Sequence, residues 1–395
     1  MGCAIGIGNA GRGTVSQPSY LRDTTQTSPH HTMRTVLPSI AQIILAATAS
    51  AYGQRTDSVA TRHNQFSARL QAEGVFYNLE YDHPLKPGYT LPLAIARPQV
   101  CYAYDSLFWL AAGWHYGAMA GRRKAWQSYP IISLQARLAK GFHIRLGELP
   151  DAREHQLPEF LYTQQRAWLN RPETGAQLTY RNRWVQAETW VDWCHFVWRN
   201  TSENEQFLQG VQVNLRPMGS VDFNLKGFLL GHHSGGQLDT THLPVTTSTN
   251  MGLLASYLSP SLGNSQLRVG GEADYALSED ASVATPLSKR TGWATRLMAV
   301  LQGYGLRGQL GYYLAHRFVS LRGEELYSAY SSWSNGAVRE VRSMLIGEVD
   351  YAKEFARGLS FYCGLHALYD LRLGQVDYGF WVGLRAEVGM GKWGW

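Results

Sequence analysis

The sequence predicts an all-β fold: a closed antiparallel transmembrane β-barrel of about sixteen strands, with fourteen to eighteen as the range. Three observations lead to this class. The 395 residues are 12% aromatic and contain 40 glycines, whereas only 17% are charged, against a usual ~25%. Apolar and polar residues alternate with a period of two in many segments. The connections between these segments alternate between short and long, which is typical of outer-membrane barrels.

The length of the alternating segments decides between two all-β architectures. In residues 358–371 and 375–390, apolar side chains occupy every second position, so each segment has one apolar and one polar face. A soluble sandwich shows the same alternation, but its strands usually have ~5–6 residues. A tilted strand that crosses a membrane needs ~9–11 residues. The observed runs of roughly 10–14 residues therefore favour the barrel.

The N-terminal 53 residues do not fit this pattern. Residues 33–53 contain a short basic start at Arg34, an apolar stretch and a run of small residues ending at Ala51. This order predicts a secretory signal peptide; a buried core helix is the alternative. Residues 1–32 are polar and without periodicity, and we interpret them as a spurious or disordered extension. Residues 54–395 then form a single barrel domain.

The strands can be placed by alternation and by the turn residues between them. Short connections are expected at 139–141, 181–183, 217–219, 303–305 and 356–358, and long ones at 79–94, 118–128, 150–173, 231–247, 278–290 and 319–337. The sixteen expected strands lie near 65–78, 95–104, 106–117, 129–139, 142–149, 174–182, 183–198, 205–216, 219–230, 248–258, 266–277, 291–303, 305–318, 338–353, 358–371 and 375–390. An even number puts both termini on the periplasmic side.

The C-terminal residues carry a resemblance to known proteins. The chain ends Gly391-Lys392-Trp393-Gly394-Trp395 and resembles the last strand of Gram-negative outer-membrane barrels, which ends on an aromatic residue read by the barrel-insertion machinery. Both tryptophans share the parity of polar residues, so we expect a bulge at Gly389 or Gly391.

Three internal segments, 171–178, 190–193 and 205–207, extend the resemblance to porin-like outer-membrane proteins of the Bacteroidota type. The resemblance implies location in the bacterial outer membrane, with lipid and the assembly machinery as partners.

A barrel of this size has a lumen wide enough for water. Because a cation that faces lipid at mid-bilayer costs ~2–4 kcal/mol, charged residues on the polar parity should face the lumen. The predicted lumen-lining residues are Arg137, Arg145, Arg181, Glu188, Asp192, Arg268, Glu272, Arg296, Arg307, Glu348, Asp350, Arg385 and Glu387. The first three arginines would favour anions; the alternative is that the charges only pair across neighbouring strands.

The connection 150–173 is long, charged and aromatic. It could fold inward and constrict the lumen, as the third loop of trimeric porins does, or it could pack on the external surface. Its candidate constriction residues are Arg153, Glu154, His155 and Glu159.

We expect a porin-like, non-enzymatic barrel that passes small polar solutes and is able to form homo-oligomers. One alternative is a non-conducting barrel with a structural or surface-assembly role. A second is an outer-membrane hydrolase or metal site at the rim around His232, His233 and Ser234, near Asp239 and His242.

The sequence contains no common catalytic or nucleotide-binding motif, and its cations are too scattered for a nucleic-acid partner. No cofactor and no metal are expected. Cys101, Cys194 and Cys363 are too far apart to suggest a disulfide framework.

Overall fold

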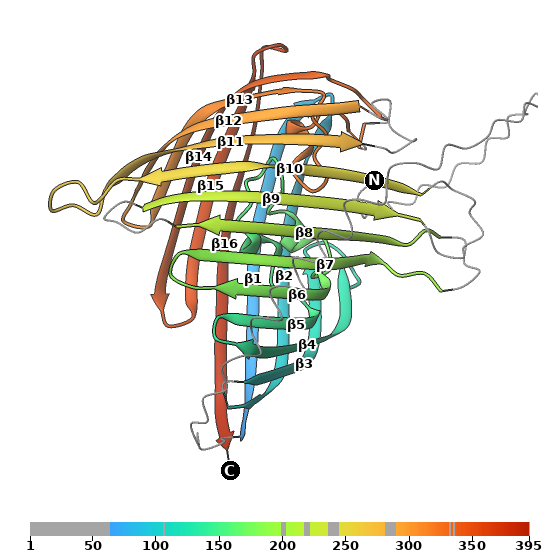
Figure 1. The fold of residues 1–395 in the computed structure, drawn as a ribbon, viewed down its shortest axis with the longest axis vertical. Helices are drawn as coiled ribbons and strands as arrows, with labels where there is room; N and C mark the ends of the chain where they lie inside the picture. The colour runs from blue at the N-terminus through green and yellow to red at the C-terminus, as the bar shows by residue number, and fades with distance from the viewer. Residues whose placement is uncertain are drawn as a thin grey trace, which may run out of the picture. The chain divides into compact units, whose positions relative to one another are not determined.

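Sixteen antiparallel strands form a closed ring in the computed structural model, which describes residues 64–394 apart from 106, 199–202, 217–221, 236–244, 281–289, 332 and 335. Each strand is hydrogen-bonded to the next along the chain, and β1 closes the ring on β16 (Figure 1). The prediction of a closed sixteen-stranded antiparallel barrel is confirmed. The expected extension 1–32 and signal peptide 33–53 lie outside the described residues.

The elements follow one another with few helical interruptions. The strands are β1 (Asn64–His83), β2 (Lys86–Tyr104), β3 (Phe108–Met119), β4 (Gln127–Ala139), β5 (Phe142–Glu148), β6 (Thr174–Arg181), β7 (Val185–His195), β8 (Gln206–Leu215), β9 (Asp222–Ser234), β10 (Thr246–Leu258), β11 (Arg268–Asp280), β12 (Arg290–Gly303), β13 (Leu306–His316), β14 (Val341–Ala356), β15 (Leu359–Asp370) and β16 (Gln375–Gly394). Short helices η2 (Ala152–His155) and α2 (Arg166–Leu169) lie between β5 and β6, and η3 (Glu325–Tyr327) lies between β13 and β14.

The first hairpin differs from the sequence-based placement. A long connection was expected at 79–94, but β1 and β2 continue to a two-residue turn at 84–85. Their inner faces carry Leu79 and Tyr81 on β1 and Leu93 on β2, all of which are buried. These residues keep the period of two in a stretch where a loop was expected. The hairpin is longer than expected because its apolar side chains are buried against segments of the chain that lie inside the lumen.

The outward face is apolar and exposed, as expected for a surface that meets lipid. Val100, Ile132 and Leu310 are 62%, 61% and 69% exposed. The strands β9, β10 and β11 have 13 residues each, and a tilted strand of that length rises about 33 Å, enough to cross the hydrocarbon core. Within the described residues, no helix is both long and apolar enough to span a membrane.

The seam between β1 and β16 contains the expected bulge. Met390 is paired with Ala68 and Lys392 with Ser67, so the register skips Gly391. One extra residue reverses the parity of the strand. The register shift therefore lies at one of the two glycines where the bulge was expected.

Two long connections occupy the lumen. Residues 149–173 and 317–340 join there through hydrogen bonds from Thr163 N to Arg322 O (2.8 Å) and from Glu324 N to Glu159 O (2.9 Å). Phe160 of the first connection is 1% exposed and packs against Phe318 and Tyr327 of the second. The main hydrophobic core of the described chain therefore includes side chains inside the ring as well as the strands' inner faces.

Candidate functional site

His155 holds the connection 149–173 inside the barrel. Its Nδ1 lies 2.6 Å from Glu188 Oε1 on β7, and its Nε2 lies 2.9 Å from Glu173 Oε2. The ring stacks on Trp190 at 3.9 Å with an interplanar angle of 15° and is fully buried. Since a carboxylate only accepts hydrogen bonds, both ring nitrogens donate and the imidazole is protonated. The backbone of His155 also accepts bonds from Gln212 and Lys226.

The electrostatics of this contact agree with a charged ring. Burial alone would lower the pKa of His155, but the hydrogen bonds to Glu173 and Glu188 raise it to about 9. The same imidazolium lowers the pKa of Glu173 against the opposing effect of burial. His155 is therefore a cation enclosed by two carboxylates, which fixes the connection in place.

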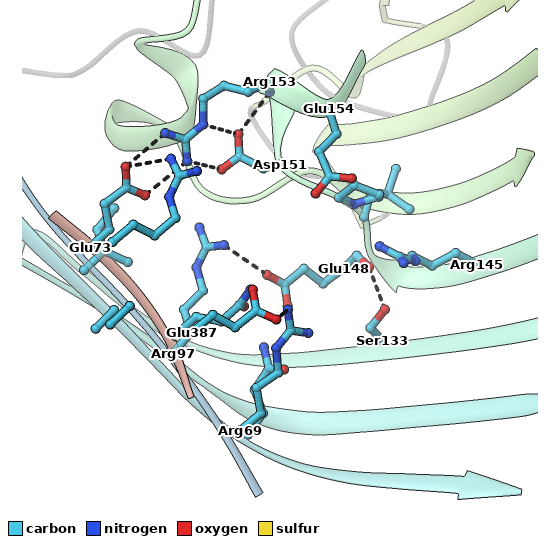
Figure 2. Close-up of a pocket in the computed structure, with 18 of the residues that line it drawn as sticks. Arg69, Glu73, Arg97, Ser133, Arg145, Glu148, Asp151, Arg153, Glu154 and Glu387 are labelled. Carbon is cyan, nitrogen blue, oxygen red and sulfur yellow. Dashed lines mark hydrogen bonds and ion pairs between the residues drawn. The ribbon is translucent and has the colours of Figure 1, made fainter. Parts of the chain in front are cut away.

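A second contact ties the same connection to β1. The carboxylate of Glu73 accepts hydrogen bonds from Arg153, Trp168, Tyr362 and Arg385. Arg153 also pairs with Asp151 at 2.7 Å. The two carboxylates raise the pKa of the Arg153 guanidinium despite its burial. Figure 2 shows Arg153 between Glu73 and Asp151 at the upper edge of a polar cavity.

That cavity has a volume of about 250 Å³ and lies in the periplasmic half of the lumen. Arg69 pairs with Glu387 at 2.8 Å, and Arg97 lies 3.9 Å from Glu148 across it (Figure 2). A second cavity of about 380 Å³ is lined by Lys226 and by acidic and basic residues of β11–β14. In it, Arg296 pairs with Glu272 and Asp274 at 2.7 Å each.

All of the predicted lumen residues lie on inward-facing parity, but they do not form one site. Arg137 and Arg181 lie at the periplasmic mouth and are exposed, whereas Arg145 bonds Gln135 within the first cavity. The inserted connection is contacted by Glu188 and Asp192. The first cavity is lined by Arg385 and Glu387. The second cavity is lined by Arg296, Arg307, Glu272, Glu348 and Asp350. Arg268 pairs with Asp222 near the periplasmic end of β11. The four constriction candidates lie in the lumen, with His155 fully buried, Arg153 and Glu159 partly buried, and Glu154 exposed.

A different group of side chains meets at the external end of the outward face. Trp193, Phe207, His233 and Thr247 are successive cross-strand partners on β7, β8, β9 and β10. Trp193 lies 5.4 Å from Phe207 and Phe207 stacks on His233 at 4.9 Å, both between ring centroids. Below them on β10, Met251 and Leu253 are 42% and 58% exposed. The row therefore lies at the upper border of the lipid-facing belt.

Within this row, His233 and Thr247 are directly hydrogen-bonded. Thr247 Oγ1 lies 3.1 Å from His233 Nδ1, and His233 Nε2 lies 3.0 Å from the carbonyl oxygen of Gly235. A carbonyl only accepts, so Nε2 carries the proton and Nδ1 is left to accept from the threonine hydroxyl. A hydroxyl that donates to a fixed imidazole, itself oriented through its other nitrogen, is the arrangement of an activated nucleophile.

The cluster of His232, His233 and Ser234, which was one of the alternatives considered, is not formed. His232 and Ser234 share the inward parity of Leu230, whereas His233 lies on the outward face. The reason is the two-residue period of a strand, which sends neighbouring side chains to opposite faces. Two adjacent imidazoles therefore cannot ligate one metal here, and the described residues contain no cluster of three or more metal-ligating side chains. Asp239 and His242 lie outside the described residues.

The sequence model of the lipid A 3'-O-deacylase-type family matches residues 56–390. The chain belongs to this family. The match covers most of the sequence and all of the ring of strands except the last four residues of β16. No curated protein matches the chain.

The barrel of this deacylase-type protein is similar in fold to solved outer-membrane proteins. OprD of Pseudomonas aeruginosa is 10% identical, with a TM-score of 0.46 over 82% of this chain and 95% of OprD. OpdL of P. aeruginosa is 11% identical, with a TM-score of 0.48 over 82% and 99%. A loop-deletion mutant of Vibrio cholerae OmpT is 11% identical, with a TM-score of 0.49 over 82% and 99%.

The deacylase-type protein is an outer-membrane barrel, as the closed ring and its apolar outer face require. The prediction of that location is confirmed. The expectation of a non-enzymatic protein is wrong, because the family is one of deacylases. Thr247 was not among the candidate site residues, because it was expected to lie in the long connection 231–247. Residues 246–250 are uniformly polar and show no alternation, so only the pairing of β10 with β9 identifies Thr247 as part of the strand.

Proposed function

We propose that this barrel hydrolyses an ester-linked acyl chain of an outer-leaflet glycolipid, with Thr247 as nucleophile and His233 as general base. The observation that carries the proposal is the hydrogen bond of 3.1 Å between Thr247 Oγ1 and His233 Nδ1 on the outward face. Membership of a lipid A 3'-O-deacylase-type family supports the reaction class.

The position of the pair suits a lipid substrate. His233 is one residue from the external end of β9, and Thr247 is the second residue of β10. The ester bonds of a membrane lipid lie between its polar headgroup and its acyl chains. A nucleophile at the upper border of the apolar belt is therefore at the depth of an ester carbonyl, without any need to lift the lipid from the membrane.

The reaction can be written with these two side chains. Thr247 Oγ1 bonds to the ester carbonyl carbon while its proton moves to His233 Nδ1. The carbon–oxygen bond to the glycolipid then breaks, and His233 returns the proton to the departing alkoxide. Water, deprotonated by His233, attacks the acyl-threonine and releases the fatty acid. The proton goes back to Thr247, so no oxidant or cofactor is needed.

The test is acyl release from lipopolysaccharide by the purified full-length barrel in detergent, followed by mass spectrometry of the lipid. Thr247→Val keeps the side-chain shape but removes the hydroxyl, and His233→Ala removes the base. Each should lower kcat/KM by at least about 100-fold, the usual contribution of such groups. Undiminished hydrolysis by Thr247→Val would overturn its role as nucleophile.

Two matched controls separate catalysis from folding. Thr249→Val removes a hydroxyl from the same face of the same strand, where Thr249 Oγ1 has no hydrogen-bond partner among the described residues. His232→Ala removes the adjacent imidazole, which lies on the inward parity. Both variants should keep wild-type activity. If they lost activity as strongly as His233→Ala, the effect would belong to the stability of the rim rather than to chemistry.

A second candidate function is the passage of small polar solutes through the lumen. It is supported by the cavities of about 250 and 380 Å³, whose walls carry charged residues of both signs. The two connections packed across the lumen restrict any such path. Planar-bilayer conductance of the wild-type protein tests this candidate: stepwise single-channel currents would support it, and their absence at high protein density would exclude it.

A further inference from the structure

An exposed basic segment lies at the tip of the β3–β4 hairpin, at the external end of the barrel. Residues 120–126 join the two strands, and Arg122, Arg123 and Lys124 are consecutive and exposed. None of the three forms an ion pair within the part of the chain that the structure describes. We call these three residues the basic tip.

The segment that carries the basic tip is held in place. Trp126 N donates to Gly117 O at 2.7 Å, and Arg122 N donates to Met119 O at 3.1 Å. Gln127 Nε2 reaches across to Leu169 O at 2.9 Å, which ties the hairpin to the connection that fills the lumen. The guanidinium of Arg122 lies 4.7 Å from the Trp126 ring centroid. The backbone of the tip is thus held in place, and its three like charges are consecutive in the chain, with no ion pair to a carboxylate among the described residues.

The level of the basic tip relative to the membrane follows from the residues below it. Trp114 and Tyr116 on β3 face outward and are 46% and 48% exposed, and Trp114 Nε1 donates to Ser128 Oγ at 2.9 Å. Such amphipathic rings mark the border between hydrocarbon and headgroups. Since Tyr116 is three residues from the end of β3, the basic tip lies at headgroup level, where lipid phosphates are within reach.

We propose that the basic tip binds the phosphate groups of outer-leaflet lipopolysaccharide. Charge complementarity is the basis: three cations that form no ion pair with any described residue lie at headgroup level, where they meet a phosphorylated glycolipid, and guanidinium groups bind phosphate in bidentate geometry. The inference does not depend on the proposed hydrolysis, because β3 and β4 lie on a different part of the ring from β9 and β10. It assigns a lipid-binding site that holds a glycolipid against the barrel wall.

The experiment compares a triple variant, Arg122→Gln, Arg123→Gln and Lys124→Gln, with the wild type in detergent. Binding is measured to lipopolysaccharide and to the same lipopolysaccharide after chemical removal of its phosphates. The triple variant should bind the phosphorylated form at least about tenfold more weakly. Wild type and variant should bind the dephosphorylated form equally, and the difference between them should shrink as salt is raised.

The periplasmic turns offer a matched control. Lys140→Gln, Arg181→Gln and Arg183→Gln remove the same charge from exposed positions at the opposite end, and Arg183 also lies over a tryptophan, with 4.8 Å to the Trp184 ring centroid. This variant should bind lipopolysaccharide like the wild type.

Equal weakening by both triple variants, or unchanged binding by the tip variant, would overturn the proposal. Competition by millimolar inorganic phosphate as effective as by lipopolysaccharide, or tighter binding of duplex DNA, would assign the basic tip to another ligand. Heat-modifiable gel mobility confirms that each variant is folded.

Discussion

Glu188 on β7 lies 2.6 Å from the ring of His155, which belongs to a connection between two other strands. The contact joins the barrel wall to the chain inside it, and Glu173 completes it from the other side of the ring at 2.9 Å. Because the imidazolium and both carboxylates are buried or nearly so, the removal of His155 leaves two buried carboxylates without their shared cation.

His155→Ala should therefore loosen the connection 149–173. The loss of the cation from a buried cluster is expected to cost about 3–5 kcal/mol of stability. The urea midpoint of the variant should fall, and its conductance in planar bilayers should rise above that of the wild type. His143→Ala, near the periplasmic end of β5, is the control. An unchanged midpoint and conductance for His155→Ala would show that the contact does not hold the connection.

The same contact predicts a dependence on pH. The pKa of His155 in the folded protein is raised to about 9 from an ordinary value near 6.5. A raised histidine pKa contributes stability that is fully present below the ordinary value and is lost as pH rises through the folded value. Between pH 7 and pH 10 the wild type should lose stability and become more susceptible to proteolysis within 149–173. In His155→Ala this alkaline transition should be absent; its persistence would point to another titrating group.

Gly210 on β8 gives a steric test of the same region. A Cβ built on Gly210 would lie 2.2 Å from the Trp190 ring, and Trp190 is 1% exposed and stacked on His155. Gly210→Ala should displace the indole and destabilise the barrel by about 1–3 kcal/mol, measured as a lower urea midpoint with altered tryptophan fluorescence. Gly347→Ala on β14, where a Cβ meets nothing within 4 Å, should be neutral. Equal effects of the two variants would contradict the steric argument.

Trp193 allows binding at the rim to be separated from chemistry. It lies two strands from His233 in the outward row and offers apolar surface to an acyl chain. Trp193→Ala should raise KM for lipopolysaccharide about 10-fold and change kcat little, because it removes contact area and no reacting group. Trp184→Ala removes a tryptophan of the same 37% exposure at the periplasmic end and should leave both constants unchanged. A loss confined to kcat in Trp193→Ala would place the residue in the chemistry instead.

The sequence by itself determined the barrel, since alternation with a period of two is a local property that each strand carries in its own residues. The length of the strands favoured a membrane-spanning ring over a sandwich. The inward orientation of Glu272 and Arg296 could be predicted from the alternation within their own strands. The first hairpin was misplaced because the packing of Leu79 and Tyr81 against the lumen segments is a long-range effect, which local patterns in the sequence do not show.

Only the tertiary structure decided which side chains meet. His155 and Glu188 are brought together by the path of a connection through the lumen, and His233 and Thr247 by the register between β9 and β10. Register depends on pairing energies summed over whole strands, so the cross-strand partner of His233 could not be found from nearby residues. His232 and His233 are adjacent in the sequence, but the pleat of the strand sends their side chains to opposite faces. The partner of His233 is 14 residues away in the chain and directly opposite in the sheet.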